Sequence, residues 1–170
     1  LKKGVMMKNL FSVKGKVALV TGGSRGIGEM IAAGYLANGA KVYISSRKAE
    51  TCDATAERLS KEYEGNCISI PADLSNLDGI AALVSKIKED EDSLDILVNN
   101  AGASWGEPIE EYSEKGWDKV MDTNVKGVFF LTQKLLPLLK ASGNAEDPAR
   151  VINIGSIDGI KTGLFDAFSY

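Results

Sequence analysis

Short apolar segments alternate with longer segments of helical periodicity from Lys16 onward. The apolar segments are rich in Val, Ile and Leu, and segment 17–20 is apolar without alternation. A strand of this kind is buried on both faces, as in a parallel sheet that helices cover on each side. The pattern predicts strands at 17–20, 41–45, 67–70, 94–98 and 150–154, and helices at 27–38, 49–63, 76–89 and 113–141.

Several residues at the ends of these segments are helix signals. Gly39 follows the first helix as a C′ glycine, and Ser75 is expected to cap the third helix with Asp78 as its capping-box partner. Ser113 is expected to open the long fourth helix. Alternating strands and helices predict an α/β fold, a doubly wound parallel sheet with right-handed crossovers. No linker, repeat or low-complexity segment divides the chain, so we predict a single domain over 1–170 with a flexible extension at 1–13.

In an open parallel sheet, ligands bind beyond the carboxyl ends of the strands, so the residues at those ends form the candidate site. A glycine-rich turn follows the first predicted strand and leads into a helix: Thr21, Gly22, Gly23, Ser24, Arg25, Gly26, Ile27 and Gly28. The glycines allow a tight turn and a close approach of a phosphate, and the helix N-terminus favours an anion. The turn lacks the Gly-Lys-Ser/Thr ending of a P-loop. We therefore predict that it binds the phosphates of a dinucleotide.

The residues after the second predicted strand indicate which dinucleotide is bound. They are Ser46, Arg47 and Lys48, whereas a site specific for NAD places an acid here to hold the ribose 2′-hydroxyl. Arg47, together with Arg25 of the glycine turn, is available to pair with a 2′-phosphate. The residues favour NADP(H) as the cofactor; the alternative is two solvated surface arginines.

The remaining predicted strands also end in polar or small residues. Asp73 and Leu74 follow the third strand, where the carboxylate can accept a hydrogen bond from an adenine amino group or simply mark the entry to the next helix. The fourth and fifth strands lead into Asn99-Asn100-Ala101-Gly102 and Gly155-Ser156. All five strands therefore place candidate ligand-binding residues at the same edge of the sheet.

Composition and charge exclude several classes of function. The chain has 20 Lys and Arg against 23 Asp and Glu, and the net charge of −3 predicts neither nucleic acid nor an anionic membrane as a partner. It has no histidine, which excludes Ser-His-Asp and Cys-His nucleophiles, a His general base and His-ligated zinc. Two cysteines make no disulfide framework or zinc site, and no apolar run reaches the ~18 residues of a membrane span. No secretion signal is visible, so we predict a cytoplasmic protein. Because the chain has no histidine and only two cysteines, we predict no bound metal.

Five motifs in order resemble those of the short-chain dehydrogenase/reductase family. Residues 21–28 are similar to its TGxxxGxG turn and residues 99–102 to its NNAG segment. Asn124 matches its helix asparagine, Ser156 its catalytic serine and Tyr170 the tyrosine that opens YxxxK. The resemblance implies a Rossmann-type fold, with five of the usual seven strands present in the order 3-2-1-4-5. Residues 104–106 and 148–156 further resemble the rhamnolipid-type β-ketoacyl reductases, which reduce 3-oxoacyl thioesters with NADPH.

The resemblance also implies a mechanism, in which a hydride passes from the nicotinamide to a carbonyl carbon. Tyr170 would contact the cofactor and give its proton to the developing alkoxide, Ser156 would hydrogen-bond the carbonyl oxygen, and Asn124 would hold a water of the proton relay. Taken singly, Ser156 can merely end a strand, Asn124 break a helix and Tyr170 be a surface aromatic. The alternatives for the whole protein are a family member that acts on a sugar, polyol or other alcohol, and a non-catalytic dinucleotide-binding protein.

The lysine of YxxxK would stand four residues after Tyr170, which is the last residue of the chain. Lys161 comes too early in the sequence to replace it. An unassisted tyrosine titrates near pH ~10, so we expect the chain alone to have negligible reductase activity. The fifth strand would lie at an edge, so we also expect poor solubility.

The helix predicted at 113–141 is apolar on more than one stripe. One face is expected to cover the sheet. The other resembles the subunit interface of the family, which implies a homo-oligomer, a dimer or tetramer; the alternative is that this face packs on a further helix.

Overall fold

The computed structural model describes residues 11–161, and within them five parallel strands form one sheet in the order β3-β2-β1-β4-β5. The strands are β1 (Val17–Thr21), β2 (Lys41–Ser45), β3 (Cys67–Ser69), β4 (Ile96–Asn99) and β5 (Arg150–Asn153). The α-helices are α1 (Gly26–Ala37), α2 (Ala49–Glu62), α3 (Leu77–Asp90), α4 (Glu114–Met121) and α5 (Val128–Ser142). The predicted fold class and strand order are confirmed, and each predicted strand is present with ends shifted by at most two residues.

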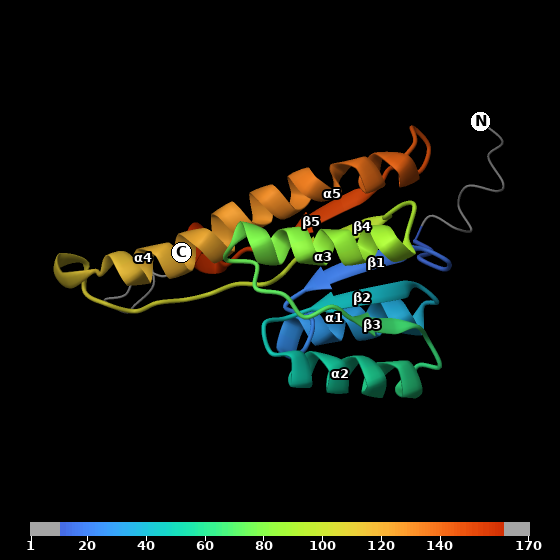
Figure 1. The fold of residues 1–170 in the computed structure, drawn as a ribbon, viewed down its shortest axis with the longest axis horizontal. Helices are drawn as coiled ribbons and strands as arrows, with labels where there is room; N and C mark the ends of the chain where they lie inside the picture. The colour runs from blue at the N-terminus through green and yellow to red at the C-terminus, as the bar shows by residue number, and fades with distance from the viewer. Residues whose placement is uncertain (1–10, 162–170) are drawn as a thin grey trace.

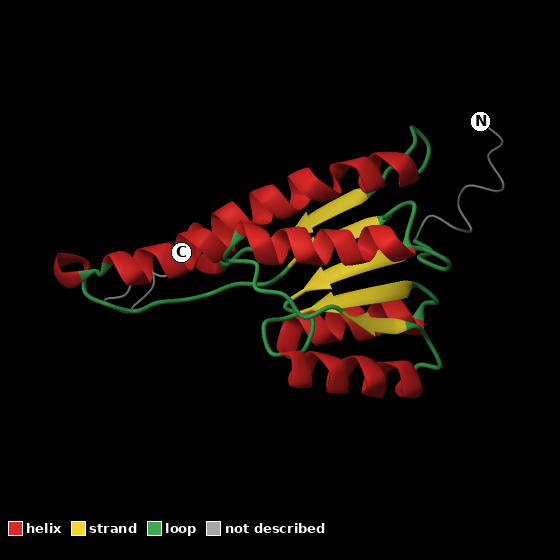
Figure 2. Ribbon diagram, viewed as in Figure 1, coloured by secondary structure: helices red, strands yellow, loops and turns green. Residues whose placement is uncertain are grey.

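Helices cover both faces of the sheet, and two apolar clusters fill the spaces between (Figure 2). Leu19 and Leu97 point to α3 and α5, whereas Ala18 and Val20 point to α1 and α2. Successive residues of a strand point to opposite faces, so a strand covered on both sides is apolar at every position. This explains why β1 shows no alternation and is buried from Ala18 to its end.

Two of the predicted helix-end signals are confirmed. Gly39 lies just beyond α1 with φ +80°, in the left-handed region that favours glycine. Ser113 caps α4, because its Oγ accepts a hydrogen bond from the backbone N–H of Gly116 at 3.1 Å.

The predicted cap of α3 is wrong. The cap is Asn76, whose side chain accepts from the Gly79 N–H at 2.8 Å, and not Ser75. The helix begins one residue later than predicted, which places Gly79, instead of Asp78, three residues after the cap. Ser75 donates instead to Asp73, through both its backbone N–H and its hydroxyl.

The predicted helix at 113–141 is one helical stretch with a π-turn in its middle. The π-turn, η2 (Asp122–Gly127), joins α4 to α5 directly, and α4 extends beyond the sheet (Figure 1). The buried side chains of α5 are Leu131, Leu135, Leu138 and Leu139. Val125 and Phe129 are exposed to 52% and 61%, so the expectation of a second apolar face is confirmed.

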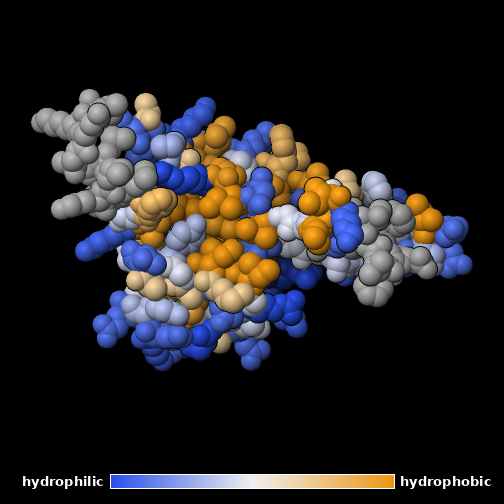
Figure 3. Space-filling view, turned by 180° about the vertical axis from the view of Figure 1, so that it is seen from behind, coloured by the Kyte–Doolittle hydropathy of each residue, from blue (hydrophilic) through white to orange (hydrophobic). Residues whose placement is uncertain are grey.

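β5 is the edge strand of the described sheet, and its side chains are exposed. Val151, Ile152 and Ile154 are exposed to 43%, 39% and 40%. By register Ile152 lies beside Val98, on the face that α1 and α2 cover elsewhere. Figure 3 views that face and shows hydrophobic residues gathered across its middle. The exposed apolar edge expected at the fifth strand is therefore present.

Val13, within the predicted N-terminal extension, packs against the cluster beneath α1 and α2. Two short 3₁₀ turns, η1 (Ile109–Glu111) and η3 (Ile157–Gly159), follow β4 and β5. Between residues 11 and 161, no helix has both the length and the apolar character that a bilayer crossing requires.

Candidate functional site

The carboxyl ends of all five strands lie along one edge of the sheet, where the arrowheads in Figure 1 point. The predicted site residues between 21 and 156 lie in the loops at this edge, in the first turn of α1 or in η2. α4 extends from the sheet on the same side (Figure 1). Tyr170 lies outside the described residues, so its predicted role stays a prediction.

The glycines of the β1–α1 turn meet different constraints. Gly22 and Gly26 have φ of +65° and +58°, which favour glycine. A Cβ on Gly23 would lie 2.7 Å from Ile44 Cγ2, and one on Gly28 would lie 2.3 Å from the Gly22 carbonyl oxygen. A Cβ on Gly26 would meet no atom within 4 Å. The turn therefore packs tightly against its neighbours but stays open at Gly26, where a ligand can reach the backbone.

The N-terminus of α1 presents backbone N–H groups without a side-chain cap. Arg25 occupies the cap position in an extended conformation, and its side chain makes no capping hydrogen bond. The N–H groups of a first helical turn have no acceptor within the helix, and they lie at the positive end of its dipole. The Thr55 hydroxyl of α2 donates to the Ser24 carbonyl oxygen at 3.0 Å and so fixes the turn from behind. This arrangement suits an anionic group such as a phosphate.

Two arginines beside the glycine turn have no counter-charge within the described residues. Arg25 and Arg47 are exposed and form no hydrogen bond or ion pair through their side chains there. The other two arginines of the chain, Arg58 and Arg150, are both paired with carboxylates. The two free guanidinium groups lie where the sequence predicts a 2′-phosphate.

The β2–α2 and β3–α3 loops lie side by side. The Ala72 N–H donates to the Ser46 carbonyl oxygen at 3.0 Å, which brings Asp73 next to the predicted adenosine position. Oδ1 of Asp73 accepts both hydrogen bonds from Ser75, while Oδ2 accepts none from a described residue. Both interpretations of this aspartate therefore remain compatible with the structure: it shapes the helix entry and keeps one oxygen for a ligand. Leu74 is buried beneath the loop.

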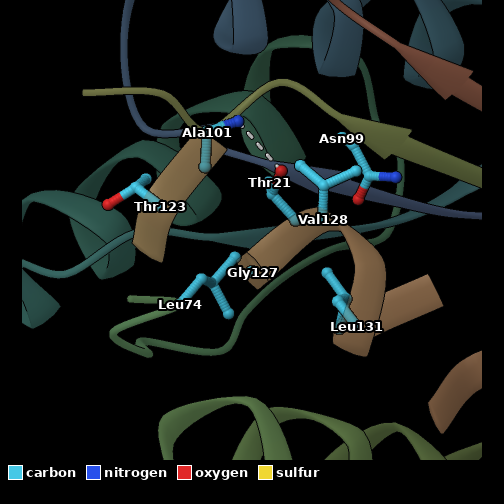
Figure 4. Close-up of a pocket in the computed structure, with 8 residues that line it drawn as sticks. All are labelled: Thr21, Leu74, Asn99, Ala101, Thr123, Gly127, Val128 and Leu131. Carbon is cyan, nitrogen blue, oxygen red and sulfur yellow. Dashed lines mark hydrogen bonds between the residues drawn. The ribbon is translucent and has the colours of Figure 1, made fainter. Parts of the chain in front are cut away.

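Thr21 and Asn100 tie the ends of β1 and β4 together. The Thr21 hydroxyl oxygen accepts from the N–H groups of Asn100 at 2.9 Å and Ala101 at 3.0 Å, the latter drawn in Figure 4. Nδ2 of Asn100 donates to the Thr21 carbonyl oxygen at 2.9 Å. The Asn100 side chain thus holds the glycine turn, and Gly102 continues the exposed loop. The sequence placed Thr21 at the start of the glycine-rich turn but did not predict that its hydroxyl joins the ends of two strands. A hydroxyl residue at the end of a buried strand, just before the glycines, could have indicated this role.

A cavity of about 10 Å³ lies behind this junction. Figure 4 shows its lining: Thr21, Leu74, Asn99, Ala101, Thr123, Gly127, Val128 and Leu131. A space of this size holds about one water molecule. This cavity is therefore far too small to hold a dinucleotide.

Two of the predicted catalytic residues lie at the same edge. Asn124 is in η2, where its Oδ1 accepts from the Ala103 N–H at 2.8 Å and its Nδ2 donates to the Ala103 carbonyl oxygen at 2.9 Å. Ser156 follows β5, and its Oγ accepts from the Asp158 N–H at 3.2 Å. Because the serine oxygen is the acceptor in that bond, its proton remains available to another group.

The loop from β4 to α4 is held by an aromatic side chain and a carboxylate. The Trp105 ring packs on Gly116, where a Cβ would lie 2.4 Å from the ring, and the Lys119 ammonium lies 4.6 Å from the ring centroid. Glu107 accepts from the Ser113 N–H at 2.8 Å, and this backbone hydrogen bond lowers the pKa of the Glu107 carboxyl. These contacts keep the loop beside Asn124 in place.

The donors at this edge fit a phosphate-bearing ligand. An open glycine, an uncapped helix N-terminus and two unpaired arginines lie on neighbouring loops, and the free Asp73 oxygen adds an acceptor. Between residues 11 and 161, no group of three or more His, Cys, Asp or Glu side chains is placed to hold a metal ion. The arrangement therefore suits a ligand that carries phosphate groups and no metal ion.

Comparisons with known proteins agree with this description. The rhamnolipids biosynthesis 3-oxoacyl-acyl-carrier-protein reductase of Pseudomonas aeruginosa is 54% identical over 164 residues, which are 96% of this chain and 63% of that protein. The structure of the Pseudomonas aeruginosa RhlG/NADP active-site complex matches with a TM-score of 0.85 and 57% identity, over 90% of this chain and 59% of that one. L-Sorbose reductase from Gluconobacter frateurii, complexed with NADPH and L-sorbose, matches with a TM-score of 0.84 and 28% identity, over 89% and 56%.

The chain spans less than two thirds of the length of each of these relatives. The pattern that describes the short chain dehydrogenase family matches residues 16–170, which is nearly the whole chain. The chain therefore belongs to the short-chain dehydrogenase family.

Proposed function

We propose that the protein is an NADP(H)-dependent oxidoreductase that reduces a carbonyl to a hydroxyl group, with a 3-oxoacyl thioester as substrate. The observation that carries the cofactor choice is the pair of free guanidinium groups, Arg25 and Arg47, beside a strand end that lacks an acid. The structure of a similar protein is a complex with NADP. The relative that is 54% identical is named for 3-oxoacyl reduction, which supports the substrate class.

In this proposal different residues at the edge of the sheet bind different parts of the dinucleotide. The turn from Gly22 to Gly28 and the N-terminus of α1 hold the diphosphate, and Arg25 and Arg47 hold the 2′-phosphate. Ser46 and the free oxygen of Asp73 line the adenosine side, above the buried Leu74. Ala101 and Gly102 border the nicotinamide side, where Asn100 keeps the glycine turn in place.

The bound NADPH would supply the hydride. Ser156 has a proton that it can donate to the carbonyl oxygen, and Tyr170 is the proposed proton donor. The Asn124 amide has a second hydrogen and a second lone pair beyond those used on Ala103. It can therefore hold a water of the proton relay while it stays bound to the loop.

Direct binding tests the cofactor assignment without requiring turnover. We expect Arg47→Asp to weaken NADPH binding about tenfold to a hundredfold, because a charge-assisted hydrogen bond contributes roughly 1.5–3 kcal/mol. Binding of NADH is expected to change little, since it has no 2′-phosphate. Titration of the wild-type and variant chains by nicotinamide fluorescence or calorimetry gives both dissociation constants.

Lys140→Asp is the matched control for that substitution. It makes the same change of charge in the last turn of α5, which leads to the opposite edge of the sheet. It is expected to leave both affinities unchanged. Equal losses of NADPH and NADH affinity in Arg47→Asp would contradict the 2′-phosphate assignment, and no binding of either dinucleotide by the wild-type chain would contradict the proposed function.

The second candidate for the substrate is a sugar ketone, because the similar structure from Gluconobacter frateurii contains L-sorbose. Initial rates of NADPH oxidation separate the two, in a form of the protein that carries both Tyr170 and a lysine four residues after it. The proposal expects kcat/KM to be at least about tenfold higher, or ~1.4 kcal/mol in transition-state binding, for an acetoacetyl thioester than for sugar ketones. The reverse preference would favour the sugar substrate.

We further propose that the partner of the exposed helical face is a second copy of the chain. A groove of about 340 Å³ on this face, here called the outer groove, is lined by Met121, Asp122, Val125, Lys126, Phe129 and Phe130. The Phe129 and Phe130 rings meet edge to face, with centroids 5.2 Å apart. The groove therefore has an exposed ring beside an apolar hollow. In two copies related by a two-fold axis, the ring of each copy can enter the hollow of the other.

A further inference from the structure

The π-turn η2 lies between two loops of the proposed dinucleotide site. On one side is the Asp73–Leu74 turn after β3, and on the other is the loop after β4 that contains Ala103. Figure 4 shows the η2 residues Thr123 and Gly127 around the small cavity, together with Leu74 and Ala101 from the two loops. η2 thus lies at the junction of both loops with the sheet.

The contact with the first loop depends on a glycine. Gly127 is buried, and a Cβ there would lie only 2.5 Å from the Leu74 carbonyl oxygen. Across the same turn, a Cβ on Gly79 of α3 would lie 2.0 Å from the Asp73 carbonyl oxygen. The Asp73–Leu74 backbone is therefore enclosed by two glycines from different helices, and neither helix can bear a side chain at the contact without moving.

The contact with the second loop is a pair of hydrogen bonds. Asn124 binds both the N–H and the carbonyl oxygen of Ala103, at 2.8 and 2.9 Å. In an α-helix, positions three residues apart project within about 60° of one another. A π-turn takes in more residues per turn, so the angle between Asn124 and Gly127 widens and the two residues can reach different loops.

We propose that η2 is a positioning element, which ties the Asp73–Leu74 turn to the loop after β4 through Gly127 on one side and Asn124 on the other. That these loops flank a dinucleotide rests on the function proposed above; the tie itself is a property of the unliganded chain. Its consequence is that loosening either contact of η2 moves both loops, and so both halves of the dinucleotide site.

Amide hydrogen exchange of the full chain without dinucleotide tests the tie. Asn124→Ala removes only the bonds to Ala103 and introduces no clash. We expect it to accelerate exchange in residues 101–104, and also in 72–76, by at least about fivefold, the lower end of typical coupling between sites. Gly127→Ala is expected to accelerate exchange in the same two segments.

Gly34→Ala is the matched control. Gly34 is an exposed helical glycine of α1, and a Cβ there would meet no atom within 4 Å. It is expected to leave exchange in both segments unchanged. Acceleration confined to 101–104 in Asn124→Ala would overturn the proposal, because each contact would then serve only its own loop. If the Gly127→Ala variant does not fold, the exchange rates of the Asn124→Ala variant alone decide whether η2 couples the two loops.

Binding of NADP+ then connects the tie to the proposed function. Both single variants are expected to bind NADP+ more weakly than the wild type. The double variant is expected to bind no more weakly than the single variant with the lower affinity, because the effects of residues that act through one element are not additive. Fully additive losses would contradict the tie. If the wild-type chain binds no NADP+, the proposed function fails, while the exchange measurements still decide whether η2 couples the two loops.

Discussion

Individual glycines at the strand edge differ in what a side chain would disturb. At Gly26 only the left-handed backbone conformation requires glycine, because space beside it is open. At Gly23 the requirement is steric, since the Ile44 side chain and the Val20 carbonyl oxygen lie where a Cβ would be. Glycine thus leaves the backbone accessible to a ligand at Gly26 and allows close packing at Gly23.

Gly23→Ala is expected to destabilise the chain by about 1–3 kcal/mol, the usual effect of forcing an extra methyl into a packed region. The measurement is urea denaturation with extrapolation to water. Gly34→Ala, with no neighbour within 4 Å, is expected to be neutral or to stabilise by roughly 0.4–1 kcal/mol. Equal stabilities of the two variants would show that Gly23 is not confined by β2.

Elements are joined at the opposite edge of the sheet by one carboxylate, Asp95. Its Oδ1 accepts from Lys16 Nζ at 3.0 Å and from the Ser142 hydroxyl at 2.6 Å, and its Oδ2 accepts from the Val17 N–H at 2.8 Å. Burial acts to raise the pKa of Asp95, but the hydrogen bonds from Ser142, Val17 and Lys16 outweigh it and hold the pKa below the ordinary value. The group thus links β1, the segment before β4 and the end of α5.

Asp95→Asn is expected to lower the free energy of unfolding at pH 7 by about 1–3 kcal/mol, because charge-assisted hydrogen bonds are lost. The pKa of Asp95 is depressed in the folded state, so its contribution is present above about pH 4 and is lost as the pH falls through the folded value. The difference between wild type and variant should therefore shrink below pH 4. Urea denaturation across pH measures this.

Asp92→Asn is the control for that series. Asp92 is exposed and has no hydrogen bond or ion pair with a described residue, so its replacement should change stability little at any pH. A constant difference between wild type and Asp95→Asn down to pH 2 would show that the depressed pKa does not contribute.

At the scale of the whole molecule, the apolar surfaces of the described residues include the edge strand β5 and the outer groove. The groove lies on the stretch formed by α4, η2 and α5, which projects beyond the sheet (Figure 1). Phe129 gives the groove an exposed aromatic ring, a type of side chain enriched at interfaces, whereas the exposed apolar side chains of β5 are aliphatic. The groove, rather than β5, is therefore the surface to which we assign the proposed association.

Phe129→Asp is expected to weaken self-association by about 2 kcal/mol or more, about thirtyfold, because a buried aromatic contact is replaced by a charge that must be desolvated. Sedimentation equilibrium of both chains measures the change. Phe11→Asp is the control: Phe11 is 91% exposed and does not line the groove. An unchanged association constant in Phe129→Asp would exclude the groove as the interface.

Much of the fold was predictable because its signals are local. The buried strand β1, the end of α1 just before Gly39 and the cap at Ser113 each depend on a few consecutive residues and their periodicity. The cap at Asn76 was mispredicted because Ser75 and Asn76 are adjacent and both can cap, so local chemistry alone does not distinguish them.

The sequence by itself determined the succession of strands and helices along the chain, and the sheet edge at which the candidate loops with Arg25 and Arg47 lie, since both follow from local periodicity and parallel topology. Only the tertiary structure decided that Thr21 holds Asn100, that Asn124 is bound to Ala103, and that Gly127 abuts Leu74 across a π-turn. These contacts join residues 21 to 79 positions apart. Hydrogen bonds and close packing depend on interatomic distances to within a few tenths of an ångström and on bond directions. Both are fixed only when the helices pack against the sheet.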